Sequence, residues 1–282
     1  MIIGHQKQRQ FLKKSAEANR IPHAFLFSGQ EQLGKKALAV EFARSLVKDS
    51  HPDFILIEPE NNIQISQIRE LIWKMSLRPY SAPFKVAVID QAHLMNQEAQ
   101  NCFLKTLEEP KGNSILILIT EHPEMLVSTI LSRVQRIKFF PVKKEEIENY
   151  LIKQGASKKK AEHLSSFSSG RPGAAMDFFA DDSKIENQEK IISDIDKISK
   201  ADFSFRFQYA KSLAEQNYKE ILDIWLRYFR GLFLFCLKGD NSIKYSLSKL
   251  KRIISSIQST NHLMSSTNIN PKLALEILLM EM

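Results

Sequence analysis

Two short segments of this chain carry residues that could bind the phosphates of a nucleotide. Gly29, Gly34 and Lys35 have the spacing of a phosphate-binding loop and follow a short apolar strand pattern. In such a loop, backbone N–H groups and the N-terminus of the next helix face phosphate oxygens, and the lysine reaches the β- and γ-phosphates. Asp90 ends a second apolar strand pattern, and its carboxylate would help to hold Mg²⁺. The alternative interpretation is an ordinary glycine-containing turn between a strand and a helix.

Two further positions depart from the pattern of an active ATPase. Lys36 stands where a Ser or Thr hydroxyl would coordinate Mg²⁺. Gln91 follows Asp90, where many such enzymes place a glutamate that polarises the attacking water. An amide can orient water but cannot accept its proton at neutral pH. We therefore predict that the chain does not turn over ATP efficiently, and we assign it no metal ligands.

The elements that would position these residues alternate between strands and helices up to about residue 141. Strands are predicted at residues 24–28, 54–57, 86–89, 115–120 and 136–139, and the run that ends at Asp90 is apolar and mostly β-branched. Amphipathic patterns predict helices at residues 6–18, 35–47, 66–75, 96–107 and 123–131. This alternation is typical of a parallel sheet that is covered by helices on both faces.

Beyond residue 141 only helical patterns remain. Three short helices are predicted at residues 143–154, 158–167 and 172–179. An acidic, polar stretch around residues 181–184 is interpreted as a linker, and the rest of the chain reads as helical. We therefore predict three domains, namely an α/β domain at residues 1–141, a three-helix domain at 142–181 and a helical domain at 182–282.

Composition and charge exclude several classes of protein. The 282 residues are 43% apolar and 26% charged, which is an ordinary globular composition. The net charge of +8 permits contact with nucleic acid but does not require it, because the lysines are scattered. Cys102 and Cys236 form neither a disulfide framework nor a zinc set, and no apolar run approaches the ~18 residues of a membrane span. We expect a soluble cytoplasmic protein without a membrane partner.

The order of these motifs resembles the AAA+ clamp-loader subunits of replicative DNA polymerases, and above all the delta-prime family of bacterial DNA polymerase III. Besides the phosphate loop, the resemblance rests on residues 51–54, 85–93, 101–110 and 129–133. It extends to residues 270–276 and therefore spans the whole chain. The resemblance implies an AAA+ core of the nucleotide-binding type, a three-helix lid and a helical collar that holds an oligomer together.

The resemblance also implies roles for single residues. Arg133 would be an arginine finger that reaches, in trans, the ATP bound by a neighbouring subunit; without the resemblance it would be an ordinary helix-end arginine. Thr120 falls at the position of a γ-phosphate sensor, or is a plain hydroxyl at a strand end. The lid arginine of active members is replaced by Ala174. The implied nucleotide site is therefore degenerate and need not be occupied, and it comprises Gly29, Gly34, Lys35, Lys36, Asp90 and Thr120.

The function that the resemblance implies is that of the non-hydrolysing delta-prime subunit, which helps to load the sliding clamp onto primed DNA as part of the DNA polymerase III holoenzyme. The implied partners are gamma or tau ATPase subunits and the delta subunit, with the clamp and DNA engaged through the complex. No cofactor is required, although weak ATP or ADP binding is compatible with the motif. One alternative is an ATP-hydrolysing subunit of the gamma or tau type. A nucleotide-sensing adaptor outside replication is a third, which leaves Ser132 and Arg133 unexplained.

The remaining conspicuous side chains are interpreted as structural. Trp73, Trp225 and the phenylalanines are assigned to the helix-packing core. His93 is expected to pack or cap rather than to catalyse. The sequence Glu108-Glu109-Pro110 is interpreted as the end of a helix, because proline cannot continue one.

Overall fold

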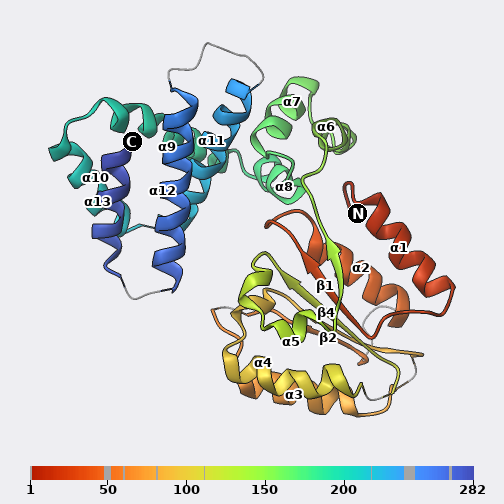
Figure 1. Cartoon of the computed structure of the whole chain (residues 1–282). Coiled ribbons are helices and arrows are strands. Elements are labelled where there is room, and N and C mark those ends of the chain that lie inside the picture. Colours follow the sequence, from red (N-terminus) through yellow and green to blue (C-terminus); the bar gives the residue numbers. More distant parts are fainter. Residues whose placement is uncertain are drawn as a thin grey trace. The chain divides into compact units, whose positions relative to one another are not determined.

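The computed structural model describes residues 2–47, 52–59, 61–80, 82–110, 112–216, 218–237, 245–266 and 269–282 (Figure 1). His51, the first residue of the segment 51–54, lies outside these ranges. The chain divides into two compact units, Met1–Phe179 and Ala180–Met282. In the described part of the chain, no helix is long and apolar enough to cross a membrane.

The first unit is built around a five-stranded, all-parallel sheet with the strand order β2-β3-β4-β1-β5. The strands are β1 (Ala24–Ser28), β2 (Phe54–Ile57), β3 (Lys85–Ile89), β4 (Ser114–Thr120) and β5 (Gln135–Lys138). β1, β3 and β4 are buried along their whole length, which explains why they read as continuous apolar runs. The prediction of a parallel α/β sheet is confirmed.

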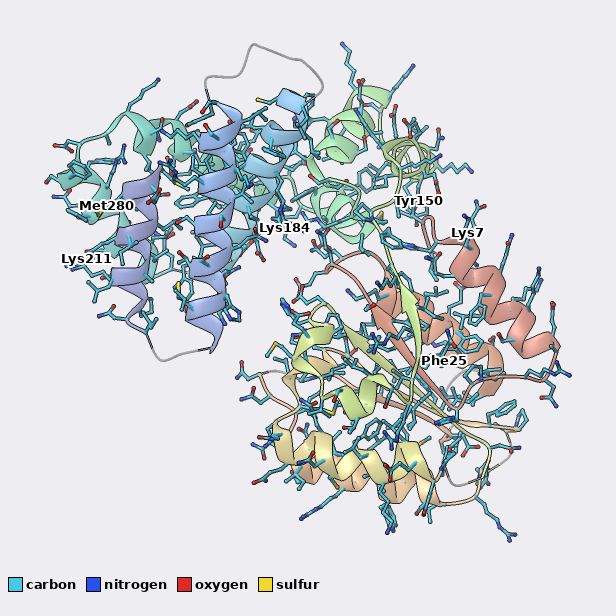
Figure 2. The ribbon with its side chains drawn as sticks, viewed as in Figure 1. Lys7, Phe25, Tyr150, Lys184, Lys211 and Met280 are labelled. Atoms are coloured by element: carbon cyan, nitrogen blue, oxygen red, sulfur yellow. The ribbon has the colours of Figure 1, made fainter. Side chains whose placement is uncertain are left out.

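Helices cover both faces of this sheet (Figure 1). One face carries α1 (Gln6–Glu17) and α2 (Lys35–Val47), and the other carries α3 (Ile65–Ser76), α4 (Gln97–Glu108) and α5 (Ser128–Leu131). Alternate residues of each strand feed the two cores, so that Phe25 packs toward α2 while Leu26 packs toward the opposite layer. The side chain of Phe25 lies within the sheet region of the first unit (Figure 2).

The single helix predicted at residues 123–131 is wrong. The structure has a 3₁₀ turn at Pro123–Met125, two extended residues and then α5. The buried amide of Gln100 stabilises the break, because it donates to the carbonyl of Met125 at 3.2 Å and accepts from the N–H of Val127 at 2.8 Å. The break also allows Leu126 to reach the core, where it is 3% exposed.

Three short helices follow the sheet and belong to the first unit. They are α6 (Lys144–Lys153), α7 (Lys158–Phe167) and α8 (Pro172–Ala180). Their positions confirm the three predicted helices to within about two residues at each end, which is the usual uncertainty of helix boundaries. The division of residues 1–181 into two domains stays a prediction.

The second unit is helical in its described part. Its helices are α9 (Asp182–Lys200), α10 (Phe203–Ala214), α11 (Tyr218–Leu237), α12 (Leu247–Ser266) and α13 (Pro271–Glu281). The linker predicted at residues 181–184 is wrong, because Asp181 caps α9 by accepting a hydrogen bond from the N–H of Ser183 at 3.0 Å. Its acidic side chains therefore mark a helix start.

The two tryptophans have opposite environments. Trp225 is fully buried in the second unit, as predicted. The core assignment of Trp73 is wrong, because this side chain is 61% exposed on α3, whose buried positions are Ile68, Leu71 and Met75. The phenylalanines are divided in the same way: Phe25 is buried, whereas other phenylalanines, such as Phe140 and Phe203, are largely exposed.

Candidate functional site

The phosphate loop connects β1 to α2 and has a backbone that requires glycine. Gly29 has φ +148°, and a Cβ there would lie 2.6 Å from the carbonyl oxygen of Phe139. Gly34 has φ +92° just before the first turn of α2, a region that residues with a Cβ rarely adopt. The backbone conformation therefore favours glycine at both positions of the motif. The loop ends at the N-terminus of α2.

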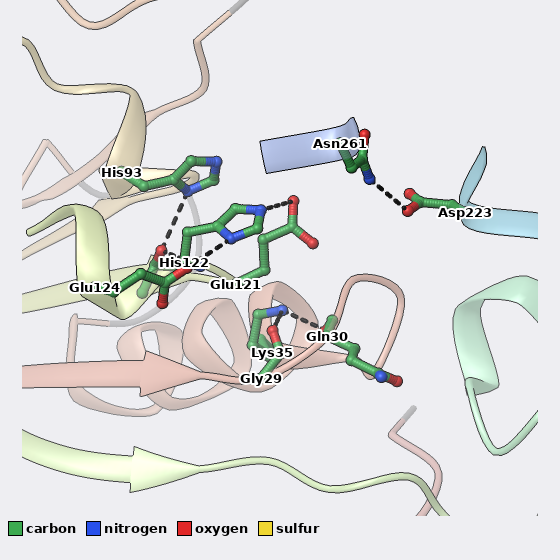
Figure 3. Close-up of polar contacts among 10 residues, drawn as sticks. Gly29, Gln30, Lys35, His93, Glu121, His122, Glu124, Asp223 and Asn261 are labelled. Atoms are coloured by element: carbon green, nitrogen blue, oxygen red, sulfur yellow. Dashed lines mark hydrogen bonds and ion pairs between the residues drawn. The ribbon is translucent and has the colours of Figure 1, made fainter. Parts of the chain in front are cut away.

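The Lys35 ammonium is buried beneath the loop. Its Nζ donates hydrogen bonds to the carbonyl oxygens of Gly29 at 2.6 Å and Gln30 at 2.5 Å, as Figure 3 shows. Burial lowers the pKa of Lys35, although the charges of Glu121, Glu31 and Asp90 partly offset this effect. The lysine of the loop therefore donates its hydrogen bonds to carbonyl groups of the same loop.

The Lys36 ammonium lies between two carboxylates at the ends of β3 and β2. Its Nζ lies 3.3 Å from Oδ2 of Asp90 and 2.5 Å from Oε1 of Glu58. Partial burial lowers the pKa of Lys36, but the hydrogen bond to Glu58 and the charge of Asp90 outweigh it, so the net shift is upward. Lys36 therefore stays protonated at neutral pH.

A nucleotide-bound Mg²⁺, which the phosphate-loop motif implies, does not fit this arrangement. The site lacks a hydroxyl at position 36, and the Asp90 carboxylate that would face the metal is paired with an ammonium group. A divalent cation at Asp90 would have to displace a like charge from two carboxylates. The observed donor set suits a lysine and not a metal.

Gln91 follows the Asp90 carboxylate at the mouth of the pocket. It has a left-handed backbone with φ 46°, and its N–H donates to Oδ1 of Asp90 at 3.0 Å. Both Asp90 and Gln91 line the cavity, so position 91 is where a general base would face a bound phosphate. The side chain there is an amide.

Thr120 ends β4 and is 1% exposed. Its Oγ1 lies 3.1 Å from Nδ1 of His93 and accepts a hydrogen bond from the N–H of His122 at 2.9 Å. The two histidine rings meet edge to face (Figure 3). Burial, followed by the charge of His122, lowers the pKa of His93 to about 4, so His93 is neutral at pH 7. The predicted sensor hydroxyl is therefore fixed by a buried network.

Gln32 connects the loop to α8, and the sequence patterns did not reveal this contact. Its carbonyl accepts from the N–H of Gly173 at 2.8 Å, and its side-chain Oε1 accepts from Nη1 of Arg171 at 3.2 Å. Its Nε2 donates to Oδ2 of Asp177 at 2.9 Å. On the other side of the loop, Nε2 of His5 lies 2.7 Å from the carbonyl oxygen of Leu33. The only sequence signal was the glycine pair at residues 170 and 173.

These contacts leave a cavity of about 340 Å³ at the ends of β3 and β4. Five of the predicted nucleotide-site residues line it, and Gly29 forms the adjacent loop. The lining includes Gly34, Lys35, Lys36, Asp90 and Thr120, together with Gln91, His93 and Gly173. The acidic side chains Glu31 and Glu121 also line it, so the cavity is less favourable for polyphosphate than the lysines alone suggest.

Arg133 is not part of this cavity. It follows α5, and its side chain is 35% exposed. The guanidinium bonds to Oε1 of Glu108 at 2.8 Å and to the carbonyl oxygen of Thr129 at 3.0 Å.

Comparisons with known proteins agree with this fold and motif set. The family model described as DNA polymerase III, delta subunit, matches residues 4–51 and 44–143. The chain is 28% identical over 261 residues to DNA polymerase III subunit delta' of Bacillus subtilis, across 84% of this chain and 79% of that protein. It is 30% identical over 158 residues to DNA polymerase III subunit tau of the same organism, across 49% of this chain and only 28% of that protein.

Among solved structures, the RuvB Holliday junction branch migration motor of Thermotoga maritima has a TM-score of 0.53 to this chain at 16% identity. That match covers 96% of this chain and 87% of the RuvB chain, and it concerns the fold alone.

Proposed function

We propose that this chain, which belongs to the AAA+ clamp-loader subunits of DNA polymerase III, acts as a non-hydrolysing subunit of the delta-prime type. The observation that carries the proposal is the ion pair between Lys36 and Asp90, at 3.3 Å. A triphosphate needs its metal at this place to neutralise the charge that develops during phosphoryl transfer. A lysine that is held by Asp90 and Glu58 supplies one fixed positive charge and no coordination sites.

Two further observations support the absence of catalysis. Gln91 has no carboxylate that could assist the attacking water. Ala174, at the position of the lid arginine, is buried and carries no charge toward a γ-phosphate. Since phosphoryl transfer depends almost entirely on positioning and charge stabilisation, these losses act on the same step.

The similarity to the delta' protein also favours this type over the tau type. It extends over most of both proteins, whereas the similarity to tau stops at about half of this chain. The ATP-hydrolysing gamma or tau type remains the alternative, because the loop keeps Gly29, Gly34 and Lys35.

We further propose that Arg133 is the arginine finger for the ATP of a neighbouring subunit. Its side chain is partly exposed at the end of a helix and lies outside the chain's own cavity. A guanidinium there would stabilise the charge on transferring phosphoryl oxygens, an effect of about 10³–10⁵ in rate in well-studied GTPases. The chain would thus promote catalysis in a neighbour without performing it.

The proposed partners are gamma or tau ATPase subunits and a delta subunit, and the sliding clamp and primed DNA would be engaged through the complex. The exposed apolar side chains of α13 support an assembly role for the second unit. Leu273, Ile277 and Met280 are 55%, 65% and 54% exposed, and they recur at helical spacing. No cofactor is required, and ATP or ADP would bind weakly and with little dependence on Mg²⁺.

An ATPase assay on the purified chain, with and without partner subunits, tests this proposal. The chain alone should hydrolyse ATP at no more than the background rate, because metal, base and lid arginine are all missing. Lys35→Ala serves as the matched control, because it removes the phosphate-loop lysine. Turnover near ~1 s⁻¹, which is an ordinary enzyme rate, would establish the alternative if Lys35→Ala abolished it.

A further inference from the structure

The guanidinium of Arg133 is held by one contact from outside its own helix. Oε1 of Glu108 lies 2.8 Å from Nη2 of Arg133, and their side chains are 49% and 35% exposed. Nη1 donates to the carbonyl of Thr129 at 3.0 Å and to Oγ of Ser132 at 3.2 Å. Thr129 and Ser132 belong to the segment that carries Arg133, so they move with it. Glu108 belongs to α4.

Buried contacts fix the position of α4, the helix that carries Glu108. Phe103 and Leu107 are buried in the core beneath the sheet, and α4 packs against both α3 and α5. The buried Gln100 of the same helix also fixes the extended residues before α5. A carboxylate at the end of α4 therefore connects the guanidinium to a helix that is packed into the buried core of the first unit.

The residue type at position 108 is unusual for its place. Glu108 is the last residue of α4, where the helix dipole presents its negative end and disfavours a carboxylate. Glu109 follows at the helix cap and adds a second negative charge. The ion pair with Arg133 offsets this unfavourable placement of an acidic side chain.

The contacts also leave suitable hydrogen-bond donors for a second ligand. A guanidinium has five N–H donors. Three are engaged by Glu108, Thr129 and Ser132, which leaves Nε–H and one N–H of Nη2 without a partner among the described residues. A phosphoryl oxygen could accept from one of these donors without breaking the contact to Glu108.

We propose that Glu108 is a positioning residue, which holds the guanidinium of Arg133 in the orientation that faces the nucleotide of a neighbouring subunit. The inference rests on the proposed role of Arg133 as an arginine finger. Glu108 touches neither nucleotide nor metal, and it acts only by restricting the rotamers of Arg133. Long arginine side chains otherwise lose much conformational entropy when they are fixed.

The test uses the reconstituted complex of this chain with its ATPase and delta partners, sliding clamp and primed DNA. Glu108→Ala should lower kcat for ATP by roughly two- to fivefold with KM unchanged, because an exposed ion pair fixes a geometry by no more than about 1 kcal/mol. Glu108→Gln keeps a hydrogen-bond acceptor and should recover part of the loss. Glu109→Ala, which changes the adjacent carboxylate, should behave as wild type.

A double-mutant cycle separates positioning from a general structural effect. In an Arg133→Ala background, Glu108→Ala should cause no further loss of kcat, because there is no guanidinium left to position. Wild-type rates in Glu108→Ala, a faster rate, or an equal loss in both backgrounds would each overturn the proposal. If Arg133→Ala itself has no effect on kcat, the arginine-finger function is what fails, and the two failures are therefore distinguishable.

Discussion

At the scale of single residues, the most consequential substitution in the loop is Lys36. The ammonium satisfies Asp90 and Glu58 at the same time, so the two carboxylates do not repel each other across the pocket. A Ser or Thr at this position would leave both carboxylates free to attract a divalent cation. The replacement therefore removes one metal ligand and blocks another.

This argument predicts a gain of metal dependence. Wild-type affinity for ATP, measured by calorimetry, should differ by no more than about twofold between Mg²⁺ and EDTA. Lys36→Thr should bind ATP about tenfold more tightly with Mg²⁺ than without it, a difference of about 1.4 kcal/mol. Lys36→Met, which removes the charge but supplies no oxygen, should not gain this dependence to the same extent. Tight, Mg²⁺-dependent binding by the wild type would contradict the assignment.

His93 provides a second prediction, concerning pH. Its pKa is lowered to about 4 by burial and by the charge of His122, whereas an unfolded histidine titrates near 6.5. Between these values the unfolded chain binds a proton that the folded chain does not, so stability must fall as the pH falls from about 6.5 to about 4. The loss of folding stability that His93 causes is on the order of 1–3 kcal/mol at the lower end of this range.

The measurement compares urea unfolding at several pH values with NMR titration of the His93 ring. His93→Asn should flatten part of the pH dependence between about 4 and 6.5, because the titrating group is removed. A variant with the same slope as wild type, or a ring that titrates near 6.5 in the folded chain, would rule out this effect.

At the scale of elements, most of the fold could be predicted because its signals are local. The central strands β1, β3 and β4 are apolar runs that are buried along their whole length, and the first predicted strand coincides with β1 (Ala24–Ser28). The errors arose where tertiary contacts override a local pattern. The helix predicted at residues 123–131 is interrupted because the buried Gln100 bonds to the intervening backbone. The acidic residues after α8 cap a helix, since a cap and a linker share the same composition.

The candidate site divides in the same way. The phosphate loop and Asp90 are visible in the sequence because spacing and strand ends determine where they lie. The partners of Lys36, Gln32 and Arg133 are not visible, because Glu58, Gly173 and Glu108 are brought to them by the fold. Roles that depend on a neighbouring subunit stay predictions.

The contact between loop and lid gives a prediction at this scale. A Cβ on Gly173 would lie 3.0 Å from both the carbonyl oxygen and the Cβ of Gln32, so Gly173→Ala should push α8 away from the loop. We expect a net destabilisation of about 1–2 kcal/mol, since overpacking exceeds the helical gain of alanine over glycine. Hydrogen exchange of the loop amides should also become faster.

Gly231→Ala is the matched control, because Gly231 also lies in a helix but has open space at its Cβ position. That substitution should be neutral or stabilising by up to about 1 kcal/mol. Equal changes of stability and of hydrogen exchange in the two variants would show that Gln32 does not restrain α8.

At the scale of the whole molecule, each of the two compact units has its own core. Leu118 is buried in the sheet of the first unit, and Leu278 is buried among the helices of the second. The chain has two tryptophans, of which Trp225 lies in the second core and Trp73 is exposed on the first unit. A Trp73→Phe variant therefore carries a fluorescent reporter of the second unit alone.

We predict that the two units unfold in separable steps. In the Trp73→Phe background, Leu278→Ala should shift the denaturant midpoint of Trp225 fluorescence by an amount equivalent to about 2–5 kcal/mol, the usual effect of such a cavity. Leu118→Ala should leave that midpoint nearly unchanged, while it lowers the stability seen by hydrogen exchange in β4. If both substitutions shift the Trp225 transition equally, the chain unfolds as one cooperative body. A subunit that must keep its nucleotide-site geometry fixed while its other unit binds partners would gain from independent cores, because strain in one core is then not transmitted to the other.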